Sequence, residues 1–310
     1  MTAATSQATA MAARRLLAAV AWNGDPAPPA DDATLAAAVA LARRNQVEGR
    51  LAGAYPDRLA GELARVQRAT AAFRCNLEQA AGRLQAAGVT PVLIKADPAE
   101  AYVYTNFDLV VGDDGWAAAV AALTPWGTRT SGHWLERDKL LVHPADGPAA
   151  HLHRSVAWFE VPVVPTGRLR ARALPSCDGA WSRPAPVDEL RITCAHAVFQ
   201  NLGFDLAELR GLRRQVADGE LVEAARAEAA AEGWRRGFEA AVATATWAIG
   251  RLDQGRTVPL PVPLAVPASL AAGLEHAAHL AGSGRPALAG RELVLRGPLV
   301  AAKRRPRRGR

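Results

Sequence analysis

Residues 88–112, GVTPVLIKADPAEAYVYTNFDLVVG, decide the fold of this chain, because the residue pattern changes there from helical to β-strand spacing. The segments 89–94 (VTPVLI) and 107–112 (FDLVVG) are short, apolar and rich in β-branched residues, which predicts two buried strands. Gly88 stands before the first strand, in the position that a left-handed helix cap prefers. Residues 116–123 predict a helix packed between strands. The chain therefore passes from helices into a sheet at this point.

A helical pattern fills the chain on the N-terminal side of Gly88. From residue 57 onward, apolar or small residues recur at alternating steps of four and three, which places them on one face of a long helix. An earlier helix is expected to reach about Ala54, with Asp32 or Thr34 as its cap. The Pro-rich stretch 25–33 separates it from a first amphipathic helix.

More strands are predicted on the C-terminal side. Residues 139–143 (KLLVH) and 149–153 (AAHLH) flank the turn segment 144–148 (PADGP), which predicts a hairpin. Residues 158–164 are expected to extend the same sheet. We therefore expect a small sheet at the centre of the chain.

The chain beyond residue 187 has helical spacing again. Asp205 can cap one of its helices, and four prolines between residues 259 and 267 interrupt regular structure. After the last helix the end is expected to be loose and basic. The predicted helices cover residues 188–201, 205–217, 219–231, 233–252 and 269–280.

These patterns predict an α+β protein with a small mixed sheet flanked by N- and C-terminal helical regions. A chain of 310 residues with 50% apolar side chains can bury a core of this kind. The predicted parts are a helical region (1–87), an α/β domain (88–165), a helical domain (166–302) and a basic tail (303–310).

Positive charge is concentrated at the end of the sequence. The chain has 37 Lys and Arg residues against 30 Asp and Glu, and six of the basic residues lie within 303–310. The formal net charge is +7 for the whole chain and +1 without this tail. We therefore expect nucleic acid to bind only weakly, through the tail.

The sequence favours a cytoplasmic protein that does not bind membranes. Cys75, Cys177 and Cys194 are too few and too irregularly spaced for a disulfide framework or a zinc pair. No apolar run of about 18 residues predicts a transmembrane helix. Residues 14–22 imitate a short signal sequence, but they also fit the first turns of an amphipathic helix.

Sequence motifs stand on the predicted strands and on the helix that follows the sheet. In order and spacing, residues 35–250 resemble a nucleotidyltransferase family of the polymerase-β-type superfamily. Members of that family carry a strand ending Leu-Lys-Gly, an Asp-x-Asp-Leu-Val strand, a strand of the Glu-x-His type and then a helix in which a histidine commonly sits. The corresponding segments here are 93–96 (LIKA), 106–111 (NFDLVV), His143-Pro144 with 151–154 (HLHR), and 188–197 (DELRITCAHA).

This resemblance implies an activity and a cofactor. In such a family three carboxylates bind two Mg²⁺ ions that hold a nucleoside triphosphate, and a nucleoside monophosphate passes to an acceptor hydroxyl or phosphate. The resemblance makes Asp108 the Mg²⁺ ligand, and Lys95 and Asn106 contacts of the nucleotide. The acceptor would be a small molecule or a peptide. A lysine at a strand end also suits phosphate binding by its position alone, although a surface lysine is the alternative.

The sequence departs from the family at two of its three acid positions. Asn106 replaces the first carboxylate and His151 the third, so that only Asp108 remains. Mg²⁺ prefers oxygen ligands, and each lost carboxylate weakens its binding. A single Mg²⁺ carried in by the nucleotide phosphates would compensate for the two lost carboxylates. Oxygen ligands from nearby acids would do the same. The acids considered as substitutes are Asp97, Glu100 and Glu160.

The histidines offer a different chemistry. His151 and His153 alternate along one strand, so their imidazoles share a face of the sheet. With Asp108 they can form a two-histidine, one-carboxylate site for Fe²⁺ or Zn²⁺, and either can act as a general base. Structural hydrogen bonding is the alternative for both, and it is the expected role of His196 beside Cys194.

Three functional hypotheses follow. The first is a nucleotidyltransferase-like enzyme that uses Mg²⁺ with a nucleoside triphosphate, with Lys95 on phosphates, Asp108 on the metal and His151 or His153 as base. The second is a catalytically degenerate protein that binds a nucleotide, a peptide or a partner enzyme in the inherited cleft. The third is an enzyme whose cleft works without two-metal chemistry.

Overall fold

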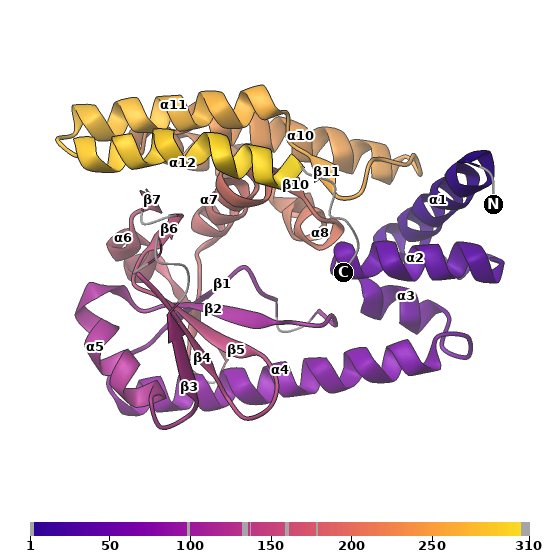
Figure 1. Ribbon diagram of the computed structural model, residues 1–310, viewed down its shortest axis with the longest axis horizontal. Helices are drawn as coiled ribbons and strands as arrows, with labels where there is room; N and C mark the ends of the chain where they lie inside the picture. Colours follow the sequence, from indigo (N-terminus) through magenta and orange to yellow (C-terminus); the bar gives the residue numbers. More distant parts are fainter. Residues whose placement is uncertain are drawn as a thin grey trace.

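The computed structural model describes residues 3–97, 100–131, 136, 138–158, 161–177 and 179–304 as a mixed α+β protein (Figure 1). The predicted combination of a central sheet with helical regions on both sides in sequence is confirmed. The α-helices within the described residues are α1 (Ala3–Leu17), α2 (Asp32–Arg44), α3 (Glu48–Ala54), α4 (Ala60–Ala86), α5 (Gly112–Leu123), α6 (Thr166–Arg172), α7 (Pro186–His196), α8 (Leu206–Gln215), α9 (Gly219–Ala231), α10 (Arg235–Asp253), α11 (Val266–Gly282) and α12 (Pro286–Arg304).

The main sheet is mixed, and its centre is built from the motif strands. Its members are β1 (Val92–Ile94), β2 (Asn106–Val110), β3 (Thr128–Ser131), β4 (Lys139–His143), β5 (Ala149–His153), β8 (Leu174–Pro175) and β9 (Ser182–Arg183). They lie in the order β3-β4-β5-β2-β1-β9-β8. β2 pairs antiparallel with β1 and parallel with β5, while β4 and β5 form the predicted hairpin.

Residues 158–164 do not extend this sheet, so that prediction is wrong. β6 (Val156–Trp158) and β7 (Val161–Val164) pair with each other as a separate two-stranded sheet. Val161 is buried against Ala277 and Leu280 of α11. The hairpin of β6 and β7 therefore turns toward the C-terminal helices, where its apolar side chains are covered.

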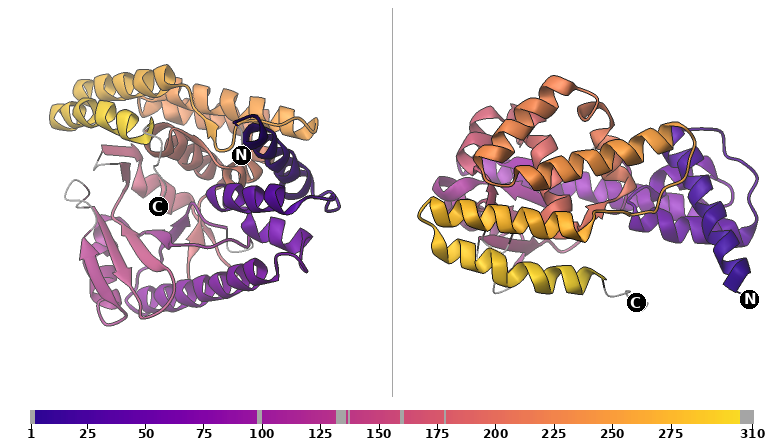
Figure 2. Two further views of the ribbon diagram at one scale, coloured as in Figure 1. Left: turned by 45° about the vertical axis from the view of Figure 1, so that its right-hand side comes forward. Right: turned by 90° about the horizontal axis from the view of Figure 1, so that it is seen from above.

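The two faces of the main sheet pack on different layers (Figures 1 and 2). One face places Leu93, Phe107 and Leu109 in a core with α4 and α5. The opposite face places Val92 and Val110 in a larger core with α7 and other helices. Side chains alternate between the faces along each strand, so the residues next to Phe107 and Leu109 point toward the helical side that contains α7.

The N-terminal helices differ from prediction in one break and one cap. The single helix expected to reach Ala54 is divided into α2 and α3, because Asn45 ends α2 and its side-chain oxygen accepts a hydrogen bond from the Leu206 backbone N–H. The cap of α2 is neither Asp32 nor Thr34. Asp31 accepts the hydrogen bond from the backbone N–H of Thr34. The long helix α4 and the left-handed Gly88 after it are as predicted.

Among the described residues, the C-terminal region contains two helices that were not predicted, α6 and α12. Asp205 caps α8 in a capping box with Glu208, as the sequence indicates. The segment expected to be loose after residue 280 instead forms α12, which packs along α11. Ala289 of α12 joins the small core around Val161, and this tertiary packing outweighs the tendency of Pro298 to break a helix. In the part of the chain that the structure describes, no helix is long and apolar enough to cross a bilayer.

Candidate functional site

The register of three strands brings the motif residues to one face of the sheet. Ile94 of β1 lies opposite Asp108 of β2, and Asp108 lies opposite His151 of β5. Partners in register point to the same face, as do residues two positions apart on a strand. Asn106 and His153 therefore lie on the face of Asp108 and His151, toward the α7 layer.

One oxygen atom is the meeting point of these side chains. Asp108 Oδ1 lies 3.1 Å from Lys95 Nζ, 2.9 Å from His151 Nδ1 and 2.5 Å from His153 Nε2. Asn106 Nδ2 lies 3.4 Å from His151 Nδ1. The structure thus brings all five predicted site residues together. We call these five residues the Asp108 cluster.

Lys95, which contacts Asp108, has an unusual backbone conformation. Lys95 follows the last residue of β1 and has a φ of 58°, in the left-handed region. A residue with a Cβ avoids this region at a cost of about 1 to 2 kcal/mol, so the surrounding structure must hold it there. The ammonium group of this residue lies beside Asp108 of the neighbouring strand β2.

The cluster is partly open to solvent. The side chains of Lys95, Asp108 and His151 are 17%, 12% and 16% exposed, whereas His153 is 3% exposed. A ligand arriving from solvent can therefore reach Lys95 and His151. His153 contacts Asp108 from the buried side.

The charges of the cluster are set by burial and by short contacts. Burial opposes ionisation of Asp108, but the Lys95 ammonium and the two imidazoles hold the pKa of this carboxyl well below its usual range. Burial lowers the pKa of His153 to about 3 in spite of the nearby carboxylate. At neutral pH, His153 is therefore a neutral imidazole whose Nε2–H donates to an ionised Asp108.

A second lysine borders the cluster and was not selected from the sequence. Lys139 lies opposite His153 in the β4–β5 pair, and its side chain is 6% exposed. Its Nζ lies 2.6 Å from Glu136 Oε1, and burial lowers its pKa. In the sequence, the rarity of lysine is the one feature that distinguishes Lys139 as a candidate site residue. Lys139 is therefore a buried side chain at the edge of the Asp108 cluster, and it is paired with Glu136.

A histidine and a glutamate complete the surroundings on the helical side. His196 Nδ1 lies 2.7 Å from Glu208 Oε1, and the other carboxylate oxygen of Glu208 accepts from the Asp205 backbone N–H. Burial raises the pKa of Glu208, and the charge of Lys95 opposes that rise, so the Asp108 cluster and this carboxyl act on each other electrostatically. Sequence reasoning identified only the helix-capping signal of this segment and missed the contact with His196.

The sequence offers Asp97, Glu100 and Glu160 as substitute ligands for Mg²⁺. Glu100 is paired with Arg50 at 2.5 Å and lies 3.5 Å from Arg210, so its oxygens are engaged with arginines. The backbone carbonyl of Asp97 accepts a hydrogen bond from the Tyr104 hydroxyl. Glu160 lies outside the described residues.

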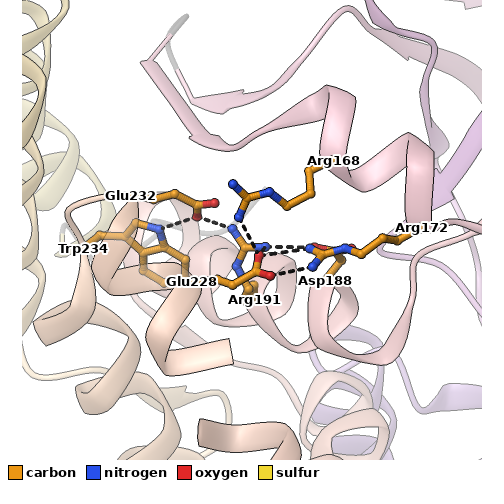
Figure 3. A network of polar contacts seen from close by, with 7 residues as sticks. All are labelled: Arg168, Arg172, Asp188, Arg191, Glu228, Glu232 and Trp234. Atoms are coloured by element: carbon orange, nitrogen blue, oxygen red, sulfur yellow. Dashed lines mark hydrogen bonds and ion pairs between the residues drawn. The ribbon is translucent and has the colours of Figure 1, made fainter. Parts of the chain in front are cut away.

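Another polar network, at the junction of α6, α7 and α9, has a different character (Figure 3). Arg191 is fully buried and bonds Asp188, Glu228 and Glu232. Arg172 joins Asp188 and Glu228 from α6. Arg168 pairs with Glu228 at the exposed edge, so three arginines are paired with three acids, as is typical of a structural ion network.

Among the residues that the structure describes, the Asp108 cluster is the group with the composition of a metal site. One ligand atom each from Asp108, His151 and His153 lies within 4.8 Å of the others, which is close enough for one metal ion. Comparisons of the chain with models of protein families, with curated proteins and with solved structures found no match. Its function is therefore inferred from this cluster and from the strands that position it.

Proposed function

We propose that this protein is nucleotidyltransferase-like and binds the phosphate groups of a nucleotide at the Asp108 cluster, without two-Mg²⁺ transfer of the nucleotide. The observation that carries this proposal is the position of Lys95 Nζ, 3.1 Å from Asp108 Oδ1 on the polar face of the sheet. β1, which leads into Lys95, lies beside β2 with Asp108, and β2 lies beside β5 with His151. The three segments that carry the resemblance are therefore neighbours in the sheet.

The side chains present do not fit a pair of Mg²⁺ ions. Of the three motif positions, only Asp108 offers a carboxylate, while Asn106 and His151 occupy the other two. Lys95 adds a positive charge beside that one carboxylate. Mg²⁺ keeps its water unless several oxygen ligands replace it, so this set favours phosphate binding over metal-dependent transfer.

Each member of the cluster has a distinct role in this proposal. Lys95 contributes the positive charge that a phosphate oxygen needs, and Asp108 orients its ammonium group. His151 is accessible enough to donate a hydrogen bond to the same phosphate. His153 is almost fully buried and holds Asp108 in position. The cluster is therefore a binding site with a fixed cationic group.

The test is calorimetric titration of the full chain with ATP, GTP, CTP and UTP, each with and without Mg²⁺. At least one nucleotide should bind in the absence of Mg²⁺, and Lys95→Met should weaken its binding by about 10- to 100-fold, because a charge-assisted hydrogen bond is lost. Arg58→Met is the matched control, since Arg58 pairs with Asp32 among the N-terminal helices. This control should bind as the wild type does.

Mass analysis of the same mixtures separates binding from transfer. We expect no pyrophosphate release in the presence of small hydroxyl compounds or peptides. Pyrophosphate formation that depends on Mg²⁺ would show that two-metal transfer survives, and absence of nucleotide binding by the wild type would refute the proposal.

A further inference from the structure

Three members of the Asp108 cluster have the composition of a metal site of another kind. Asp108 offers a carboxylate oxygen, and His151 and His153 offer ring nitrogens, with all three atoms within 4.8 Å of one another. Two imidazoles with one carboxylate suit Zn²⁺, Fe²⁺ and Co²⁺, whereas Mg²⁺ and Ca²⁺ prefer oxygen ligands alone. The donor set that is wrong for two Mg²⁺ ions is therefore right for one transition-metal ion.

We propose that this chain binds one divalent transition-metal ion between Asp108 Oδ1, His151 Nδ1 and His153 Nε2. The site shares Asp108, His151 and His153 with the proposed phosphate site, but it requires no nucleotide and is tested without one. In a tetrahedral Zn²⁺ site with bonds of 2.0 to 2.1 Å, ligand atoms lie about 3.3 Å apart. The two ring nitrogens now lie 2.9 and 2.5 Å from Asp108 Oδ1, so a shift of less than about 1 Å would admit the ion, with the ring proton of His153 moved from Nε2 to Nδ1 to free the ligand nitrogen.

The scaffold holds these ligands in place before any ion binds. Both histidines belong to β5, which is paired with β2 on one side and with β4 on the other. Asp108 lies on β2 in register with His151. Ligands on strands in the interior of a sheet lose little freedom when an ion binds, which favours affinity. The partial exposure of Asp108 and His151 leaves a path for entry.

Lys95 would compete with the ion, and this competition gives the proposal a specific signature. Its ammonium group now contacts the oxygen that the ion would take. Binding must displace that group, and its positive charge then repels the dication at close range. Lys95→Met should therefore tighten binding of the metal by at least about 10-fold, whereas a lysine of purely structural importance would have no such effect.

The experiment is titration of the untagged, full-length chain with Co²⁺ and Zn²⁺ in the absence of nucleotide. Co²⁺ should give the visible absorption of a four- or five-coordinate site with one ion per chain, and Zn²⁺ should displace it. His151→Ala and Asp108→Asn should each weaken Zn²⁺ binding by about 100-fold, since one of three protein ligands is lost. His143→Ala is the control, because His143 lies on the neighbouring strand β4, is exposed and bonds Thr130.

The outcomes are distinct from those of the nucleotide test. His153→Ala can disturb the fold because this side chain is buried, so the decision rests on His151 and Asp108. Unchanged Zn²⁺ affinity in folded His151→Ala and Asp108→Asn proteins would overturn the proposal. Failure of the wild type to bind either ion would overturn it as well. Neither result bears on whether Lys95 binds a phosphate.

Discussion

Lys95 Nζ and Asp108 Oδ1 lie 3.1 Å apart across the antiparallel pair of β1 and β2. Asp108 is the carboxylate that remains at the three motif positions, and its nearest positive charge is fixed by the protein itself. A negatively charged ligand can pair with the ammonium group of Lys95, whereas a metal ion must displace this group from Asp108. The Lys95–Asp108 pair therefore determines whether the cluster binds an anion or a metal ion.

The coupling between these two residues can be measured as stability. Asp108→Asn leaves the Lys95 ammonium, which is 17% exposed, without its charged partner, and should lower the free energy of unfolding by about 1 to 3 kcal/mol. Lys95→Met combined with Asp108→Asn should recover part of this loss, because the unpaired charge is gone. Urea denaturation of the two single variants and the double variant gives the coupling energy. Strictly additive effects would mean that the pair makes no net interaction.

Buried His276 should make the stability of the protein depend on pH. Burial in α11, assisted by nearby positive charges, lowers the pKa of this imidazole from 6.5 to about 4. The unfolded chain therefore binds a proton more readily than the folded chain does between these values. This contribution to stability is complete above pH 6.5 and is lost as the pH falls toward 4.

His276→Gln should reduce the slope of unfolding free energy against pH in this window. One group contributes at most about 1.4 kcal/mol per pH unit, so the wild type should lose stability faster than the variant. The measurement is urea denaturation at several pH values between 7 and 4. Equal slopes for wild type and His276→Gln would contradict the prediction.

The ion network in Figure 3 should be important for stability at its buried centre and not at its rim. Arg191 is fully buried, so Arg191→Met leaves Asp188 without a buried partner and should cost about 3 to 5 kcal/mol. Arg168 is 49% exposed and lies 3.3 Å from Glu228, so Arg168→Met should cost less than about 1 kcal/mol. Thermal and urea denaturation compare the two variants. Similar losses for both would show that burial does not control this network.

The basic end of the chain should account for binding to polyanions. Removal of residues 303–310 deletes six positive charges and leaves a net charge of +1. The truncated chain should keep its melting temperature and lose salt-sensitive binding to DNA, because the counterion-release contribution disappears. Fluorescence anisotropy with a labelled duplex at several salt concentrations measures this loss. Undiminished binding after truncation would place the basic surface elsewhere on the protein.

Local sequence patterns determined most helices and the central strands. The spacing of apolar residues predicts α4, Gly88 ends it with a left-handed backbone, and Asp205 caps α8, because each depends on neighbours within one or two turns. The same is true of the hairpin that carries His151 and His153. The alternation of those two histidines along β5 is sufficient to place them on one face.

Only the tertiary structure decided the remaining strand pairings and helix ends. Residues 158–164 read as a continuation of the sheet, yet they pair among themselves because Val161 is covered by α11. At the break between α2 and α3, Asn45 accepts a hydrogen bond from the backbone N–H of Leu206, which is far away in sequence. Helix α12 contains Pro298 and forms because it packs along α11. These outcomes depend on contacts between distant segments, which no local pattern records.

The candidate site also combines features that the sequence predicts with features that only the folded chain determines. All five residues of the Asp108 cluster could be named from the motifs, but the contact of Lys95, His151 and His153 with Asp108 Oδ1 could not, because it depends on the order and register of the strands. The contact of Glu208 with His196 also joins two separate helices. Residue identity thus fixed the chemistry that is available, and the packing of the chain fixed which atoms meet. The reason is physical: hydrogen bonds and ion pairs depend on distances of a few ångströms, and for residues far apart in sequence only the folded chain sets those distances.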